Sequence, residues 1–173
     1  MNVLNKILVI GGGHIGRRHI DALTKIGSKV TVVENNKDIK LDQLEIDNIY
    51  SKIEEVPNIE RYDFGVICLP NFLHNQYSKI LLTKGMNLIV EKPLCLDVTE
   101  AKQLLDLSDQ LNKQIFVVKQ NRLVDSMINL KQTLDKGDLG GLLSFSMEII
   151  WNRDENYFKQ TTWRGKKDLD GGS

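Results

Sequence analysis

The stretch 6–34 constrains the fold of this chain more than any other part of it. Residues 7–10 are apolar and predict a buried β-strand. The turn after this strand contains three glycines in the spacing G-x-G-x-x-G, namely Gly11, Gly13 and Gly16. A helix is predicted from Ile15 onward, followed by a second strand over 29–33 that ends in Glu34. Strand, glycine turn, helix, strand and acid in this order are typical of a dinucleotide site.

Each glycine of this turn has a physical role in such a site. Gly11 permits the tight turn, and Gly16 lets the helix pack closely against the strand. Gly13 has no Cβ, so the backbone there is open to a pyrophosphate. The N-terminus of the helix, at His14 and Ile15, adds unpaired N–H groups and a partial positive charge. At His14 we expect the backbone to matter more than the ring.

Glu34 is the predicted reader of the adenosine ribose. It follows Gly16 by 18 residues, close to the expected distance for the acid of a dinucleotide site. Its carboxylate can accept hydrogen bonds from ribose hydroxyls, and it would repel a 2′-phosphate. The sequence therefore predicts NAD as the cofactor, in preference to NADP. The alternative is a strand–helix–strand unit whose glycine turn binds no ligand.

Beyond Glu34, strands and helices continue to alternate up to about Asn121. Strands are predicted over 46–50, 64–69, 87–90 and 115–118. Asn71 and Asp97 are predicted to cap the two helices that lie between the last three strands. This alternation predicts a Rossmann-type α/β fold, in which helices cover both faces of a parallel sheet. Residues 1–121 are therefore predicted to form a nucleotide-binding domain.

Three strand ends carry residues suited to ligand binding. They are Gly11 to Ile15, Leu69–Pro70–Asn71 with His74, and Glu91–Lys92–Pro93. Ligands of such sheets bind beyond the carboxyl ends of the strands. We therefore expect these three segments to converge on one crevice.

The pattern changes in residues 122–173. A helix is predicted from Asp125 or Ser126 up to Gly137, which ends it. Apolar and polar residues then alternate over 143–152, which predicts a strand with one buried face, as in antiparallel sheets. We interpret residues 122–173 as the incomplete first part of a second, α+β domain with an antiparallel sheet.

Composition excludes several classes of function. The chain has 23 basic and 23 acidic residues, so no global field favours nucleic acid or an anionic membrane. Its three histidines form no cluster with metal-ligand spacing, and Cys68 and Cys95 lack the CxxC spacing. No apolar run is long enough to span a membrane, and residues 1–5 lead directly into the first strand without a signal peptide. We expect a cytoplasmic protein.

Four motifs together resemble the Gfo/Idh/MocA family of oxidoreductases (glucose–fructose oxidoreductase, inositol dehydrogenase and relatives). The motifs are the glycine stretch from Gly11 to His19, the acid Glu34, Pro70-Asn71-x-x-His74, and Glu91-Lys92-Pro93-Leu94. The segment 157–172 is most similar to members that oxidise C3 of UDP-linked N-acetyl sugars or their uronic acids. These members act in the biosynthesis of bacterial surface polysaccharides.

The resemblance implies an NAD-dependent oxidation of a sugar hydroxyl. Lys92 would be the catalytic base or proton relay, and burial beside the cationic nicotinamide would lower the pKa of its amine, so that the unprotonated form is available near neutral pH. Glu91 and Pro93 would shape the strand end, and His74 would order the loop near the cofactor. The expected NAD contacts are Gly11, Gly13, His14, Ile15, Gly16, Glu34, Leu69, Pro70, Asn71, His74, Glu91, Lys92, Pro93, Trp163 and Arg164.

The chain departs from the family pattern at its C-terminal end. In the family, the glycine pair that matches Gly171 and Gly172 precedes a helix with a catalytic histidine, whereas this sequence ends at Ser173. We expect a chain truncated relative to the family, with an unpartnered strand at 140–152 that mediates homo-oligomerisation. Such a chain would lack turnover.

Two other functions remain open. One is a stub or partner subunit that binds NAD without turnover. The other is a methyltransferase that uses the glycine turn for S-adenosylmethionine, although methyl transfer has no need of Glu91-Lys92-Pro93.

Overall fold

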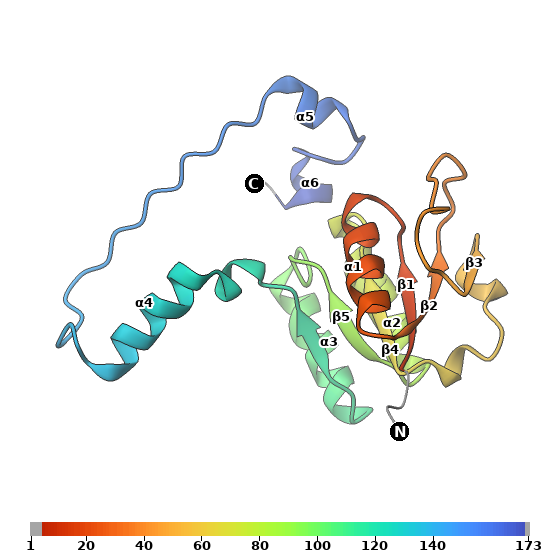
Figure 1. Ribbon diagram of the computed structural model, residues 1–173, viewed down its shortest axis with the longest axis horizontal. Helices are drawn as coiled ribbons and strands as arrows, with labels where there is room; N and C mark the ends of the chain where they lie inside the picture. The colour runs from red at the N-terminus through yellow and green to blue at the C-terminus, as the bar shows by residue number, and fades with distance from the viewer. Residues whose placement is uncertain (1–4, 172–173) are drawn as a thin grey trace. The chain divides into compact units, whose positions relative to one another are not determined.

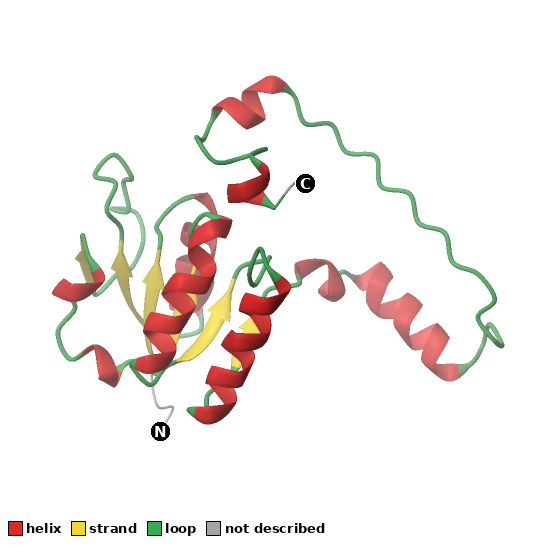
Figure 2. Cartoon of the chain, turned by 180° about the vertical axis from the view of Figure 1, so that it is seen from behind, coloured by secondary structure: helices red, strands yellow, loops and turns green. Residues whose placement is uncertain are grey.

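Six parallel strands form one sheet in the order β3-β2-β1-β4-β5-β6 (Figures 1 and 2). The strands are β1 (Lys6–Ile10), β2 (Lys29–Val33), β3 (Asn48–Tyr50), β4 (Phe64–Ile67), β5 (Asn87–Val90) and β6 (Ile115–Val117). The order reverses between β1 and β4, as in doubly wound dinucleotide-binding sheets. This computed structural model describes residues 5–171 and confirms the predicted Rossmann-type fold. Residues 1–4 and Gly172, which entered the sequence predictions, lie outside the described residues.

Three helices cover the sheet: α1 (His14–Lys25), α2 (His74–Thr83) and α3 (Val98–Gln110). Alternate residues of β1 divide the core between two faces. On one face Ile7 packs with the α1 residues Ile20 and Leu23. On the other face Leu8 packs with Leu81 of α2, in a cluster that also includes Leu104 of α3. Helix α1 therefore lies across the sheet from α2 and α3.

The two predicted helix caps have different outcomes. Asp97 caps α3, and its Oδ1 accepts from the amides of Thr99 and Glu100 at 2.7 and 3.0 Å. The prediction for Asn71 is wrong, because a 3₁₀ turn (η3, Asn71–Leu73) separates it from the start of α2. The Asn71 amide instead donates to the backbone oxygen and Oδ1 of Asp170, at 3.0 and 2.9 Å. The loop after β4 is thereby bound to α6 (Lys167–Asp170).

Residues 119–164 form a second compact unit, and residues 165–171 pack with the first. The second unit contains a 3₁₀ turn (η4, Gln120–Leu123) and the helices α4 (Asp125–Lys136) and α5 (Glu155–Lys159). Gly137 ends α4 with a φ of 74°, as predicted. The predicted domain boundary at Asn121 stays a prediction.

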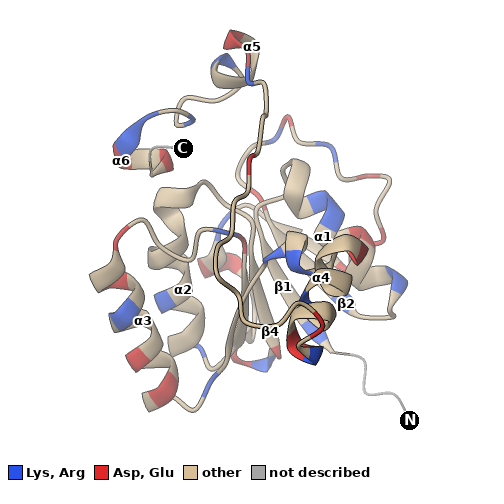
Figure 3. Cartoon of the chain, turned by 90° about the vertical axis from the view of Figure 1, so that its left-hand side faces the viewer, with Lys and Arg blue, Asp and Glu red and all other residues tan. Residues whose placement is uncertain are grey.

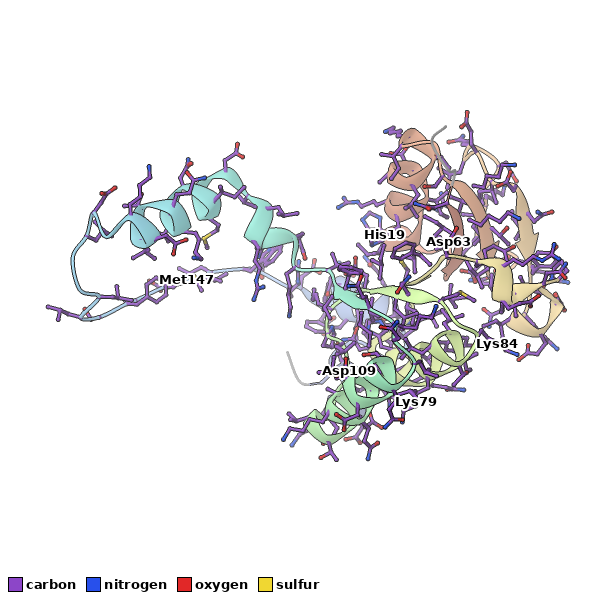
Figure 4. The ribbon with its side chains drawn as sticks, turned by 90° about the horizontal axis from the view of Figure 1, so that it is seen from below. His19, Asp63, Lys79, Lys84, Asp109 and Met147 are labelled. Carbon is purple, nitrogen blue, oxygen red and sulfur yellow. The ribbon has the colours of Figure 1, made fainter. Side chains whose placement is uncertain are left out.

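The predicted strand at 143–152 is wrong for the chain as the structure describes it. The described residues of the second unit contain no β-strand, and this segment is irregular, with Met147 labelled on it in Figure 4. Its apolar side chains are exposed, and Leu143 is 99% exposed. Alternation specifies which side chains share a face, but a strand also needs a neighbour that pairs with its backbone. The antiparallel sheet expected here is therefore not formed.

Basic and acidic residues are interspersed along the chain and do not form separate regions of one charge. Both signs occur along α3, for example (Figure 3). Among residues 5–171, no helix is long and apolar enough to cross a membrane. The same residues contain no group of three or more His, Cys, Asp or Glu that could hold a metal ion.

Candidate functional site

The glycine turn after β1 is built by close backbone contacts. Gly11 has a φ of 97°, and its N–H donates to the carbonyl of Val33 on β2 at 2.9 Å. A Cβ on Gly11 would lie 2.7 Å from the Cys68 carbonyl oxygen, and one on Gly16 would lie 2.0 Å from the Gly11 oxygen. Both positions therefore exclude every side chain larger than that of glycine.

Gly13 lies in a different environment from the other two. It precedes α1, and apart from Gly13 itself and its two chain neighbours, no described atom lies within 4 Å of the position that a Cβ would occupy. The first hydrogen bond of the helix runs from the Arg17 amide to the Gly13 oxygen at 3.0 Å. The amides of His14, Ile15 and Gly16 therefore have no partner within the helix. Open space in front of unpaired amides fits a pyrophosphate.

Glu34 holds the far side of the same turn. Its Oε2 accepts from the Gly12 amide at 2.7 Å, and its Oε1 accepts from the Asn36 amide at 2.8 Å. Each carboxylate oxygen keeps a further lone pair, so both can also accept from ribose hydroxyls. The structure therefore places the predicted ribose reader directly beside the glycine turn.

His74 joins the loops that follow β4 and β5. Its ring is 1% exposed, with Nδ1 2.6 Å from the Pro93 carbonyl oxygen and Nε2 2.8 Å from the Leu69 carbonyl oxygen. A carbonyl only accepts, so both contacts are hydrogen bonds at once only when both ring nitrogens carry protons. The Lys92–Pro93 peptide bond in this loop is cis.

His19, which the sequence analysis singled out only as part of the glycine motif, also reaches this edge of the sheet. Its Nε2 lies 2.8 Å from Oε1 of Glu91, the residue after β5. Partial burial alone would raise the pKa of Glu91, but the hydrogen bond and charge of His19 lower it, helped by the Lys92 amide and charge. One signal was available, because His19 lies one helical turn after Gly16 and so shares its sheet-facing side.

The structure thus brings three predicted segments together at the carboxyl edge of the sheet. Gly11 contacts the loop after β4 at Cys68, His74 joins that loop to Pro93, and His19 joins α1 to Glu91. Lys92 lies between the last two contacts, and its side chain is exposed. The described residues therefore do not themselves supply the burial that was expected for its amine.

Trp163 and Arg164 belong to the second unit. There the Arg164 guanidinium lies 4.5 Å from the Tyr157 ring centre and 5.7 Å from that of Trp163. The contact of these two residues with the cofactor stays a prediction.

The surroundings of the two cysteines disfavour the thiolate form. Burial, followed by the charge of Glu91, raises the pKa of Cys68. Burial and the charge of Glu100 raise the pKa of Cys95 to about 11. Both side chains are therefore protonated thiols near neutral pH, and catalysis through a thiolate is disfavoured.

A hollow of about 270 Å³ lies at the opposite edge of the sheet, where the strands begin. Lys6 and Lys29, the first residues of β1 and β2, line it together with Arg61. None of the predicted site residues lines this hollow, so the candidate site is the carboxyl edge.

The fold, the glycine turn and Glu34 define a nucleotide-binding Rossmann domain. Residues 5–119 match the family model described as "Oxidoreductase family, NAD-binding Rossmann fold". The chain therefore belongs to the GFO/IDH/MocA family and contains its NAD-binding domain.

Two curated relatives show the range of the family. The chain is 25% identical to glucose-6-phosphate 3-dehydrogenase of Bacillus subtilis, over 93% of this chain and 46% of that protein. It is 26% identical to inositol 2-dehydrogenase of Klebsiella pneumoniae, over 80% of this chain and 43% of that protein. The chain spans about a third to a half of the length of the curated relatives it matches.

A solved structure shares the fold over almost the whole chain. It is the WlbA dehydrogenase of Chromobacterium violaceum in complex with NADH and UDP-GlcNAcA. The TM-score is 0.84 at 20% identity, and the match covers 98% of this chain and 51% of that one.

The glycine turn yields a matched pair of variants. Gly16→Ala forces a Cβ against a backbone oxygen, and we expect it to lower the free energy of unfolding by at least about 2 kcal/mol. Gly13→Ala meets open space, so we expect an unchanged melting temperature but roughly tenfold weaker NADH binding, because the Cβ fills the cradle. Thermal denaturation and NADH fluorescence measure the two effects. A Gly13→Ala chain that binds NADH as tightly as the wild type would contradict the predicted phosphate position.

Proposed function

We propose that the chain acts in an NAD-dependent dehydrogenase that oxidises a sugar hydroxyl. The observation that carries this proposal is the position of Lys92, which follows β5 at the edge where the glycine turn and Glu34 lie. Relatives that are dehydrogenases of a sugar phosphate and of inositol support a hydroxyl as the reacting group.

The finer proposal is a UDP-linked N-acetyl sugar or its uronic acid, oxidised at C3 in the biosynthesis of bacterial surface polysaccharides. The resemblance of segment 157–172 to such enzymes supports it. The WlbA structure, which contains UDP-GlcNAcA, supports it further, since it matches 98% of this chain.

In this proposal each part of the site has one task. The amides at the start of α1 hold the phosphates, and Glu34 holds the ribose hydroxyls. When bound, NAD accepts a hydride from the sugar carbon. Lys92, as the free amine, accepts the proton of the sugar hydroxyl and becomes an ammonium group. The remaining residues orient the strand ends.

The choice of cofactor is tested by fluorescence titration of the chain with NADH and NADPH. We expect tighter binding of NADH, because the Glu34 carboxylate accepts from ribose hydroxyls and repels a 2′-phosphate. Glu34→Ala should weaken NADH binding roughly tenfold and narrow the difference between the two cofactors. Glu60→Ala, at an exposed glutamate remote from the turn, is the control. Equal affinity of the wild type for both cofactors would overturn the assignment.

The role of Lys92 is tested by NADH production from NAD and UDP-GlcNAcA in a longer form that supplies the rest of the family's catalytic domain, because this chain alone is expected to lack turnover. Lys92→Ala and Lys92→Arg should each lower turnover about 100-fold or more, since neither side chain can accept the proton at neutral pH. Lys84→Ala removes an exposed lysine at the end of α2 (Figure 4) and should leave turnover unchanged. NADH binding without any turnover by the wild-type longer form would favour the alternative of a non-catalytic NAD-binding stub or partner subunit.

We also propose that residues 140–152 mediate association with a second copy of the chain. Their apolar side chains are exposed, including Phe145, Ile149 and Trp151, and such a surface favours self-association. We expect light scattering to show an oligomer that the double substitution Phe145→Ser with Ile149→Ser dissociates. Ile26→Ser, at an exposed apolar residue after α1, is the control. A monomeric wild type at high concentration would contradict this proposal.

A further inference from the structure

We propose that His19 and His74 are positioning residues that hold Lys92 from both sides. The residue before Lys92 is bound by one histidine, and the residue after it by the other. The two histidines come from α1 and α2, which cover opposite faces of the sheet. This inference rests on the proposed function, since it concerns how the proposed base is held.

On the α1 side, the contact is a hydrogen-bonded pair. His19 Nε2 and Glu91 Oε1 are 2.8 Å apart, and their side chains are 20% and 16% exposed. The Glu91 carboxylate also interacts with the charge of Lys92, which helps to lower the pKa of Glu91. Without His19, this carboxylate would have Lys92 as its adjacent cation. His19 therefore keeps Glu91 from pairing with the amine that must stay free.

On the α2 side, the contact is buried and involves both ring nitrogens. The ring of His74 lies within hydrogen-bond distance of the carbonyl oxygens of Leu69 and Pro93, so it packs between the loops after β4 and β5 and holds them together. The β4 loop is itself fixed beneath the glycine turn, because the Cys68 amide donates to the Ile10 oxygen at 2.9 Å. Through these contacts, Pro93 is held in place relative to β1, the strand that precedes the glycine turn.

Lys92 itself is not restrained in the same way. Among residues 5–171, its side chain has no hydrogen bond or ion pair, and it is exposed, whereas its two neighbours are half-buried and bound. A catalytic base needs both properties. The backbone fixes the position of the Lys92 Cα, and the unrestrained side chain can bring its amine to the substrate hydroxyl. A displacement of the backbone by about 1 Å can cost a reaction roughly 100-fold.

The experiment compares disruptive and conservative variants at each histidine. His19→Leu and His74→Leu remove the polar contacts, whereas His19→Gln and His74→Gln keep side-chain N–H donors. Asp21→Asn is the matched control, since it breaks an exposed ion pair with Lys25 on the same α1 helix. Glu91→Gln is nearly isosteric and tests the α1 contact if a histidine variant fails to fold.

The first readout needs no turnover. Hydrogen exchange of the purified chain reports the amides of Glu91, Lys92 and Leu94, and we expect the leucine variants to exchange about tenfold faster there. The glutamine variants should recover part of the protection, and the control should match the wild type. Unchanged exchange at these amides, or glutamine variants as impaired as leucine variants, would overturn the proposal.

The second readout separates positioning from general stability. In the longer form used for the Lys92 test, with NAD and UDP-GlcNAcA, kcat should fall at least about tenfold in the leucine variants while KM for NAD stays within about twofold. In a Lys92→Ala background, the histidine variants should lower kcat no further. A fall of equal size in that background would overturn the proposal. If the wild-type longer form oxidises no sugar, the proposed function fails, and the exchange measurement alone decides whether the histidines hold this loop.

Discussion

The approach of Gly16 to the backbone of Gly11 is the contact on which the rest of this site depends. Only a hydrogen atom fits between the helix and the turn, since a Cβ on Gly16 would lie 2.0 Å from the Gly11 oxygen. This closeness places the start of α1 over the carboxyl ends of the central strands. It also brings His19, one turn further along α1, within reach of Glu91 at the end of β5. A local steric condition therefore determines where a distant loop is held.

Local patterns predicted the parts of the chain whose neighbours are close in sequence or set by strand order. The glycine spacing, the apolar strands and the Asp97 cap each depend on a few adjacent residues, and the six-stranded parallel sheet has the arrangement they predict. The convergence of the three strand ends follows from parallel pairing, because the carboxyl ends of all strands share one edge.

The contacts that sequence reasoning missed join residues far apart in the chain. His19 and Glu91 are 72 positions apart, and Asn71 and Asp170 are 99 apart. Neither residue type specifies its partner, since a histidine is equally suited to a core or to a surface, and an asparagine caps a helix or bonds a distant carbonyl with similar ease. The segment 143–152 illustrates the same limit. Its alternation predicted which side chains share a face, but it did not identify a strand that could pair with it.

The hydrogen bonds between Asn71 and Asp170 attach the chain to the first unit on its return. The chain leaves this unit after Val118 and rejoins it at Gly165, so the second unit is an insertion whose two ends are both attached to the first. The entropy of closing such a loop grows only with the logarithm of its length, by about 0.6 kcal/mol for each doubling. Evolution could therefore lengthen, shorten or replace the second unit at little thermodynamic cost while the nucleotide-binding edge of the sheet stays intact.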